Sequence, residues 1–229
     1  MNRISFSSLL VCILFFFGCI GEDIVNDEVD PEVRILNPVN SISVSEMYQF
    51  NATFFNNVGQ PEPVSISWSS SNESVAAINN NGLINAISEG QTTIKAIVSY
   101  NSTTIETDTA ITVITGTVDQ SLDTKSGTII STSAYELTGD FTLKMIENTN
   151  NLQLTLGSSY KASSSLPGLY VYLTNNPNTV ANAYEIGPVT IFEGSHTYTI
   201  PNVGINDYSY LLYWCKPFGV KVGGGDINN

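Results

Sequence analysis

The sequence predicts an all-β protein with two tandem β-sandwich domains behind an N-terminal export segment. Three observations lead to this fold class. Short apolar runs rich in Val, Ile, Thr, Tyr and Phe are separated by turn residues along most of the 229 residues, as strands and tight connections require. Within many runs, apolar and polar residues alternate with the period of a half-buried strand. Only 13% of the residues are charged and 11 are tyrosine, a composition that favours β-structure over helix.

The charge balance excludes one class of partner. The formal net charge is −13 and only 8 residues are Lys or Arg, whereas binding to nucleic acid requires a basic patch. The same acidity argues against electrostatic docking on anionic lipid. The three cysteines, Cys12, Cys19 and Cys215, are too few for a disulfide framework.

Residues 1–18 are expected to form a cleaved signal peptide. The apolar segment from Leu9 to Phe17 follows Arg3 and is too short to span a bilayer comfortably. A lipoprotein signal is favoured, and a plain signal peptide or a short membrane helix is the alternative. Phe16-Phe17-Gly18-Cys19 resembles the lipobox of bacterial lipoproteins. The resemblance implies that Cys19 becomes the first residue and is acylated on its sulfur and amine with chains such as palmitate. Several chains anchor stably, because each buried methylene contributes about 0.8 kcal/mol.

Residues 19–32 are expected to form an acidic tether behind the lipidated cysteine. Six carboxylates crowd this segment: Glu22, Asp23, Asp27, Glu28, Asp30 and Glu32. Such a run repels itself and stays extended, so a solvated linker explains it physically. An acidic patch at this place also resembles the export signal that sends some Gram-negative lipoproteins to the outer face of the outer membrane. This resemblance implies cell-surface display, with the periplasmic face as the alternative.

The first β-domain is expected over residues 33–115. Its β-patterned runs are Val33–Leu36, Met47–Phe55, Val64–Trp68, Val75–Ile78, Leu83–Ile87, Thr92–Tyr100 and Thr104–Ile114. About seven strands at this spacing are typical of an Ig-like sandwich. Trp68 is expected to pack across its core.

Several landmarks of this domain resemble the group-two bacterial Ig-like domain. They are Trp68-Ser69-Ser70-Ser71-Asn72, Val75-Ala76, Gly82-x-Ile84-x-Ala86, Gly90 and Thr93-Ile94-Lys95-Ala96. The family implies a spacer or an adhesin. Because no carboxylate cluster, His or Cys here suggests catalysis or metal binding, we interpret the domain as a spacer that lifts the second domain clear of the membrane.

A polar linker, residues 116–126, is expected to lead into the second β-domain, residues 127–229. The expected strands are Thr128–Ser131, Ala134–Thr138, Phe141–Ile146, Leu152–Leu156, Leu169–Leu173, Val189–Ile191, His196–Ile200, Tyr208–Cys215 and Phe218–Val222. Leu152, Leu154 and Leu156 alternate with polar residues, as a strand with one buried face requires. The segments from Gly157 to Pro167 and from Thr174 to Ala183 are expected to be surface loops.

The end of this domain resembles the DM-thirteen domain, which is catalogued as an electron-transfer domain. The motif is Tyr210-Leu211-Leu212-Tyr213-Trp214-Cys215-Lys216-Pro217-Phe218-Gly219-Val220. The resemblance covers about residues 127–227 and implies a redox-relevant thiol at Cys215. The chain departs from the family at Gly168, where an acidic residue is common, and at Gly223-Gly224-Gly225. These departures put any acid-dependent step in doubt.

The residues around Cys215 also allow a purely structural role. A reactive cysteine must be an exposed thiolate near a positive charge, a metal or a helix N-terminus. A regular strand directs Lys216 away from Cys215, and the apolar neighbours favour an inert buried thiol. His196, the only histidine, is expected to be an exposed strand residue. No metal site or cofactor is identified.

Two functions therefore stay open. The first is an accessory or binding protein, anchored in the outer membrane through Cys19, with a thiol-based redox or electron-transfer role at Cys215. The alternative is an adhesive or scaffolding protein that binds a protein or glycan ligand without redox chemistry. A hydrolase is the least supported function, because the sequence has no nucleophile elbow, phosphate-binding loop or paired acids.

Overall fold

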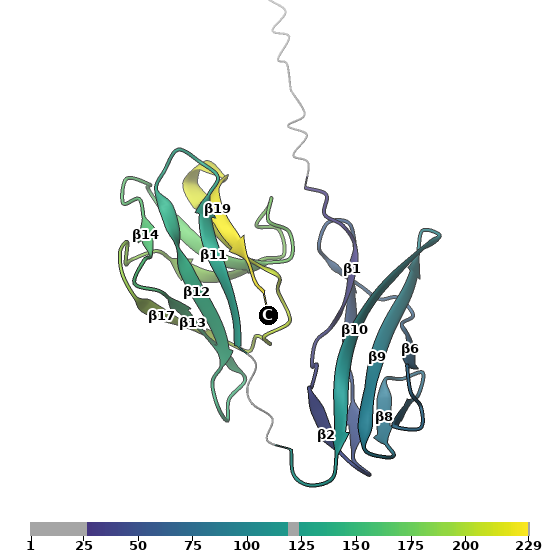
Figure 1. Cartoon of the computed structure of the whole chain (residues 1–229). Coiled ribbons are helices and arrows are strands. Elements are labelled where there is room, and N and C mark those ends of the chain that lie inside the picture. Colours follow the sequence, from purple (N-terminus) through teal and green to yellow (C-terminus); the bar gives the residue numbers. More distant parts are fainter. Residues whose placement is uncertain (1–26, 119–123, 229) are drawn as a thin grey trace, which may run out of the picture.

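The computed structural model describes residues 27–118 and 124–228. These residues form two β-domains that lie side by side (Figure 1). Among them, the only helical turn is a 3-10 turn at Lys216–Phe218, so the predicted all-β fold class is confirmed. No helix within the described ranges is long and apolar enough to cross a membrane.

The first domain is built from ten strands: β1 (Glu32–Ile35), β2 (Ser41–Ser43), β3 (Met47–Gln49), β4 (Ala52–Phe55), β5 (Pro61–Glu62), β6 (Ser67–Ser70), β7 (Ala76–Ile78), β8 (Leu83–Ala86), β9 (Gly90–Tyr100) and β10 (Thr103–Ile114). They form three small sheets, in the orders β1-β4-β5, β2-β10-β9-β6 and β3-β8-β7. The antiparallel β9–β10 hairpin has the longest strand pairing in the domain. Strand β2 pairs in parallel with the end of β10.

Strand alternation places the core of the first domain as expected. Ile94, Ala96 and Val98 on β9 are no more than 1% exposed, whereas the residues between them are partly exposed. Trp68 packs against this core and stacks on Phe50 with ring centroids 6.0 Å apart. The predicted core role of Trp68 is therefore confirmed.

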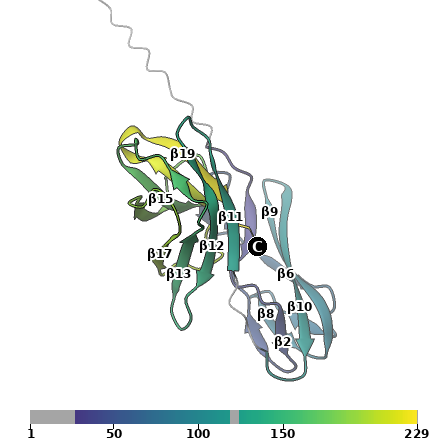
Figure 2. The same ribbon diagram turned by 60° about the vertical axis from the view of Figure 1, so that its left-hand side comes forward.

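The second domain contains β11 (Thr124–Ser131), β12 (Leu137–Met145), β13 (Asn151–Leu156), β14 (Lys161–Ala162), β15 (Leu169–Thr174), β16 (Tyr184–Pro188), β17 (His196–Pro201), β18 (Tyr210–Cys215) and β19 (Val220–Asp226). They make one antiparallel sheet in the order β16-β15-β18-β19-β11-β12-β13-β17, with β14 beside β12. The sheet encloses a single core to which β11, β12, β13, β15, β17, β18 and β19 all contribute. Figure 2 shows the strands of this sheet from a second side.

Several expected strands have different bounds in the structure. The run Met47–Phe55 is two strands, because the chain changes sheets near Phe50: β3 pairs with β8, whereas β4 pairs with β1. Val189–Ile191 was expected to be a strand and is not one, because the partner of β15 is the preceding segment, β16. The linker was expected to reach residue 126, yet β11 begins at Thr124.

Candidate functional site

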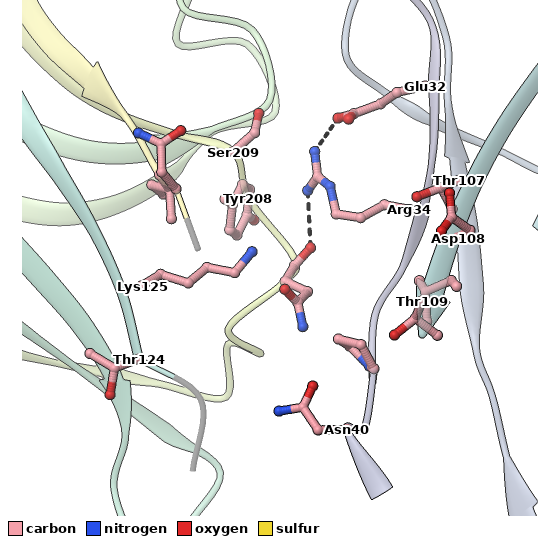
Figure 3. A pocket seen from close by; sticks show the side chains of 15 residues that line it. Glu32, Arg34, Asn40, Thr107, Asp108, Thr109, Thr124, Lys125, Tyr208 and Ser209 are labelled. Atoms are coloured by element: carbon pink, nitrogen blue, oxygen red, sulfur yellow. Dashed lines mark hydrogen bonds and ion pairs between the residues drawn. The ribbon is translucent and has the colours of Figure 1, made fainter. Parts of the chain in front are cut away.

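A polar cleft of about 530 Å³ lies between the two domains. The first domain contributes residues of β1, β10 and the segment after β1. The second contributes the start of β11, the loop before β18 and the C-terminal end. Figure 3 shows Arg34 reaching from β1 toward the second domain, with Lys125 and Tyr208 on the opposite wall. The site is therefore made by the pairing of the domains.

Arg34 is the centre of the contact between the domains. Its Nη1 donates hydrogen bonds to Oδ1 of Asn175, at 3.1 Å, and to the carbonyl oxygen of Asn206, at 3.0 Å. Its other arm pairs with the Glu32 carboxylate, and the guanidinium lies 4.6 Å above the ring of Phe55. Because the Arg34 side chain is only 13% exposed, water competes weakly for these bonds.

Three asparagines of the second domain complete this contact, which we call the asparagine clasp (Asn175, Asn176 and Asn206). Nδ2 of Asn206 donates to the carbonyl oxygen of Leu36 at 2.9 Å. Nδ2 of Asn176 donates to the carbonyl oxygens of Val58, at 3.2 Å, and of Asp27. Asn176 and Asn206 are 2% and 5% exposed, so their amides would be costly to bury without these partners.

The backbones of the two domains also approach closely beside the clasp. At Gly59, φ is +73° and an added Cβ would lie 2.6 Å from the carbonyl oxygen of Asn175. Only glycine fits both the left-handed conformation and this approach. The segment holding Gly59 therefore packs directly on the loop that follows β15.

The clasp holds the second domain close to the start of the described chain, whereas the sequence predicted that the first domain lifts the second clear of the membrane. Asn176 belongs to the second domain, yet it binds the carbonyl oxygen of Asp27, the first residue that the structure describes. Figure 1 accordingly shows the second domain beside the start of β1 and not beyond the far end of the first domain. Both domains therefore lie at the end of the molecule where the described chain begins.

The cleft presents charges of both signs and many neutral polar groups. Glu32 and Asp108 face the same space as Arg34 and Lys125, among threonine, serine and asparagine side chains. Burial, followed by the neighbouring Asp207 carboxylate, raises the pKa of the Tyr208 hydroxyl, so this group stays a neutral hydrogen-bond donor. Such a surface suits a neutral ligand rich in hydroxyl groups better than a strongly charged one.

Cys215 lies in the core of the second domain, away from the cleft. It is 0% exposed on β18, opposite Leu169 on β15 and Val220 on β19. Its Sγ has the carbonyl oxygen of Pro167 at 4.0 Å. A thiol in this position packs as a small apolar group and is closed to a reaction partner in solution.

Lys216, the cation nearest to Cys215 in sequence, is engaged elsewhere. Its Nζ binds the Glu185 carboxylate at 2.7 Å and lies 4.6 Å from the ring centre of Tyr170. The hydrogen bond from Lys216 is the main cause of the lowered pKa of Glu185. Burial, with the hydrogen bond to Glu185, raises the pKa of Tyr172 to about 12. Lys216 and Glu185 thus neutralise each other on the outer surface of the sheet, so the Lys216 ammonium does not stabilise a thiolate at Cys215.

An aromatic cluster with unpaired polar atoms occupies the same core. Tyr160 and Tyr213 are 0% exposed, and the Tyr160 ring contacts both Tyr213 and His196, at 6.2 and 5.0 Å between centroids. Neither tyrosine hydroxyl nor Nε2 of His196 has a hydrogen-bond partner within 3.5 Å among the described residues, although the two hydroxyls lie near enough to affect each other's pKa. His196 is thus half-buried, contrary to the expected exposed position, and its Nδ1 carries the proton because it faces the Gly194 carbonyl at 2.9 Å.

Sequence reasoning missed the residues that join the domains. Arg34 lies in the expected strand Val33–Leu36, the Asn175-Asn176 pair lies in an expected surface loop, and Asn206 lies between two expected strands. No spacing of residue types marks them. The predicted lipidation site, Cys19, lies outside the described residues. The redox role of Cys215 stays a prediction.

Comparison with known proteins gives one family match. Residues 32–108 match the bacterial Ig-like domain (group 2), which confirms the resemblance of the first domain. No curated protein matches the chain.

Two similar solved structures come from surface layer protein SbsC. Its domains 4–9 are 13% identical, with a TM-score of 0.33 over 87% of this chain and 31% of that one. Its domains 5–6 are 16% identical, with a TM-score of 0.32 over 87% of this chain and 98% of that one. This chain therefore spans about a third of the larger structure.

Proposed function

We propose that this protein is a lipid-anchored adhesive or scaffolding protein of the bacterial surface, and that it binds its ligand in the cleft between its domains. One observation carries the proposal: the asparagine clasp holds two β-domains together around a polar cleft of about 530 Å³. A group-two bacterial Ig-like match over residues 32–108 supports a surface role.

The chemistry of the cleft favours a glycan as the ligand. Sugar hydroxyl groups both donate and accept hydrogen bonds, and the cleft offers amide, hydroxyl and carboxylate groups that do the same. Tyr208 adds a ring with a neutral hydroxyl. A protein ligand is the other outcome that the binding experiment can reveal.

The redox alternative has less support from the structure. It rests on the resemblance of residues 127–227 to the DM-thirteen domain, and it requires a thiolate at Cys215. The 0% exposure of Cys215 favours an inert thiol. In a fragment that starts at Glu22, Cys215 is the only cysteine. We expect it to be alkylated only after unfolding; rapid alkylation of the folded fragment below about pH 7 would restore the redox role.

Ligand binding can be tested by filling the cleft. The fragment from Glu22 is applied to arrays of glycans and surface proteins, beside two variants. Asn40→Trp places a large ring on an exposed residue of the cleft wall, and Asn150→Trp places the same ring on an exposed turn outside the cleft lining. We expect Asn40→Trp to abolish binding and Asn150→Trp to leave it intact. Equal binding by both variants would exclude the cleft.

The anchor needs an independent test in cells. We expect the full chain to incorporate labelled palmitate and to fractionate with the outer membrane, and Cys19→Ser to do neither. Protease added to intact cells then distinguishes display on the cell surface from attachment to the periplasmic face.

A further inference from the structure

Three exposed apolar side chains lie at one end of the second domain. Tyr135, Phe218 and Val220 are 45%, 66% and 48% exposed. We call these residues the apical tip. Tyr135 belongs to the connection from β11 to β12, and Phe218 and Val220 lie at the turn from β18 to β19. Exposed apolar groups that gather at one place mark a contact surface more often than single ones do.

Strand pairing brings the two connections of the apical tip together. Ser131, the last residue of β11, pairs with Gly223 of β19. The amide of Thr132 then donates to the carbonyl oxygen of Val222 at 2.9 Å, and Oγ of Ser131 donates to the carbonyl oxygen of Tyr135 at 2.7 Å. The loop with Tyr135 therefore runs alongside the start of β19.

The turn that carries Phe218 is held in place. The amide of Lys216 donates to the carbonyl oxygen of Gly168 at 3.1 Å, and the amide of Gly219 closes the 3-10 turn on the carbonyl oxygen of Lys216 at 3.3 Å. Pro217 restricts the backbone further. Phe218 is thus presented outward by an ordered turn.

The apical tip lies at the end of the molecule where the described chain begins. In both Figure 1 and Figure 2 the turn before β19, the connection from β11 to β12 and the start of the first domain are at the upper end. Seven residues, 20–26, separate Cys19 from Asp27, and the eight residue-to-residue steps between them span at most about 28 Å. A lipid surface that holds Cys19 therefore lies close to this end.

We propose that the apical tip inserts into the headgroup region of the membrane in which Cys19 is anchored, so that the protein rests on the bilayer in a fixed orientation. The inference rests on the proposed anchor. Aromatic and apolar side chains are favoured at the boundary between headgroups and acyl chains. Because the net charge of the chain is −13, electrostatic attraction to anionic lipid cannot hold the apical tip at the membrane. The contact is therefore apolar. Held in this way, the second domain lies at the bilayer surface.

The test uses the full acylated chain in vesicles of phosphatidylethanolamine and phosphatidylcholine with brominated acyl chains. Ala134→Cys, in the exposed loop beside Tyr135, carries a fluorophore that bromine quenches; Asn150→Cys, on the turn between β12 and β13, is the remote reporter. Two substitutions are then compared at the Ala134→Cys reporter. Phe218→Asp charges the apical tip, and Met47→Asp charges a residue of the first domain with nearly equal exposure, 67% against 66%.

We expect quenching at Ala134→Cys and almost none at Asn150→Cys. Phe218→Asp should lower the ratio of docked to undocked protein by roughly tenfold, whereas Met47→Asp should not change it. Quenching should also persist in 1 M salt, where the Debye length is roughly 3 Å and charges farther apart than this attract each other only weakly. Equal quenching at both reporters, no effect of Phe218→Asp, or loss of quenching in salt would each overturn the inference.

Vesicle flotation separates the inference from the anchor on which it rests. Acylated protein that floats but shows no quenching at Ala134→Cys keeps its anchor and loses the apical contact. Protein that does not float overturns both. Fragments that start at Glu22 should not float, because one apolar tip without acyl chains supplies too little buried area for stable binding.

Discussion

Replacing Arg34 with alanine should uncouple the two domains. The substitution removes the hydrogen bonds to Asn175 and to the carbonyl of Asn206, at 3.1 and 3.0 Å. A hydrogen bond from a charged donor contributes about 1.5–3 kcal/mol. Because water can enter the space left by the side chain, and Asn175 keeps Ser209 as a partner, we expect a loss of about 2–4 kcal/mol in coupling free energy.

The chain allows each domain to be observed separately, because it has two tryptophans. Trp68 lies in the first domain and Trp214 on β18 of the second. In a fragment from Glu22, Trp214→Phe leaves a reporter of the first domain, and Trp68→Phe leaves one of the second. Urea unfolding followed by fluorescence then gives a free energy of unfolding for each domain in the presence of the other.

We expect coincident transitions in the parent fragment and separated transitions in Arg34→Ala, with the less stable domain moving to lower urea by about 2 M. Arg34→Lys should be intermediate, since an ammonium keeps the charge but cannot reproduce the guanidinium fork. Lys95→Ala is the matched control, because Lys95 pairs with Glu106 within the first domain. Unfolding transitions that stay coincident and unshifted in Arg34→Ala would refute the conclusion that Arg34 and the asparagine clasp couple the two domains.

Three further substitutions test the second domain. Tyr213→Phe should leave the free energy of unfolding unchanged or raise it by about 1 kcal/mol, because it removes a buried hydroxyl without a partner. Gly225→Ala should lower it by about 3 kcal/mol or more, because the added Cβ would lie 2.2 Å from the carbonyl oxygen of Thr128. Glu185→Gln should flatten the pH dependence of stability at acid pH. Since Lys216 lowers the pKa of Glu185 below its ordinary 4.5, this stabilisation is complete above pH 4.5 and is lost as the pH falls through the lowered value.

Each of these predictions has its own check. Calorimetry measures the free energy of unfolding of the Tyr213→Phe variant. A clear loss of stability would mean that the Tyr213 hydroxyl has a hydrogen-bond partner. Gly157→Ala controls for Gly225→Ala, because the nearest atom to its Cβ is 3.3 Å away; equal losses would contradict the steric argument. For Glu185→Gln, stability is measured from pH 3 to pH 7, and a curve parallel to that of the parent would show that the ion pair has no part in folding.

Local patterns in the sequence accounted for most strands. Leu152, Leu154 and Leu156 alternate with polar residues, and all three are buried on one face of β13. The same rule located the buried face of β9. Such strands are predictable because side chains alternate between the two faces of a strand, whatever its partners are.

The predicted strand bounds were wrong where pairing with neighbouring strands, and not the alternation of side chains, decides where a strand lies. β16 is a strand because its backbone bonds to β15, although its own residues, Tyr184–Pro188, show no strong pattern. β19 has three successive glycines, Gly223 to Gly225, which reduce strand propensity. They form a strand because their backbone pairs with β18 on one side and β11 on the other, where a Cβ would not fit.

The sequence by itself determined the all-β class, the division into two β-patterned regions and the Ig-like character of the first. These properties follow from short-range periodicity and turn residues, which each segment carries alone. Only the tertiary structure decided that the domains lie side by side, that Cys215 is enclosed and that a polar cleft forms between Arg34 and Tyr208. These features depend on contacts between segments far apart in the sequence: Cys215 packs beside Leu169, and Arg34 bonds Asn175, which is 141 residues away. A side-chain amide or guanidinium can bond any carbonyl that the fold brings near, so its partner leaves no mark on the local sequence.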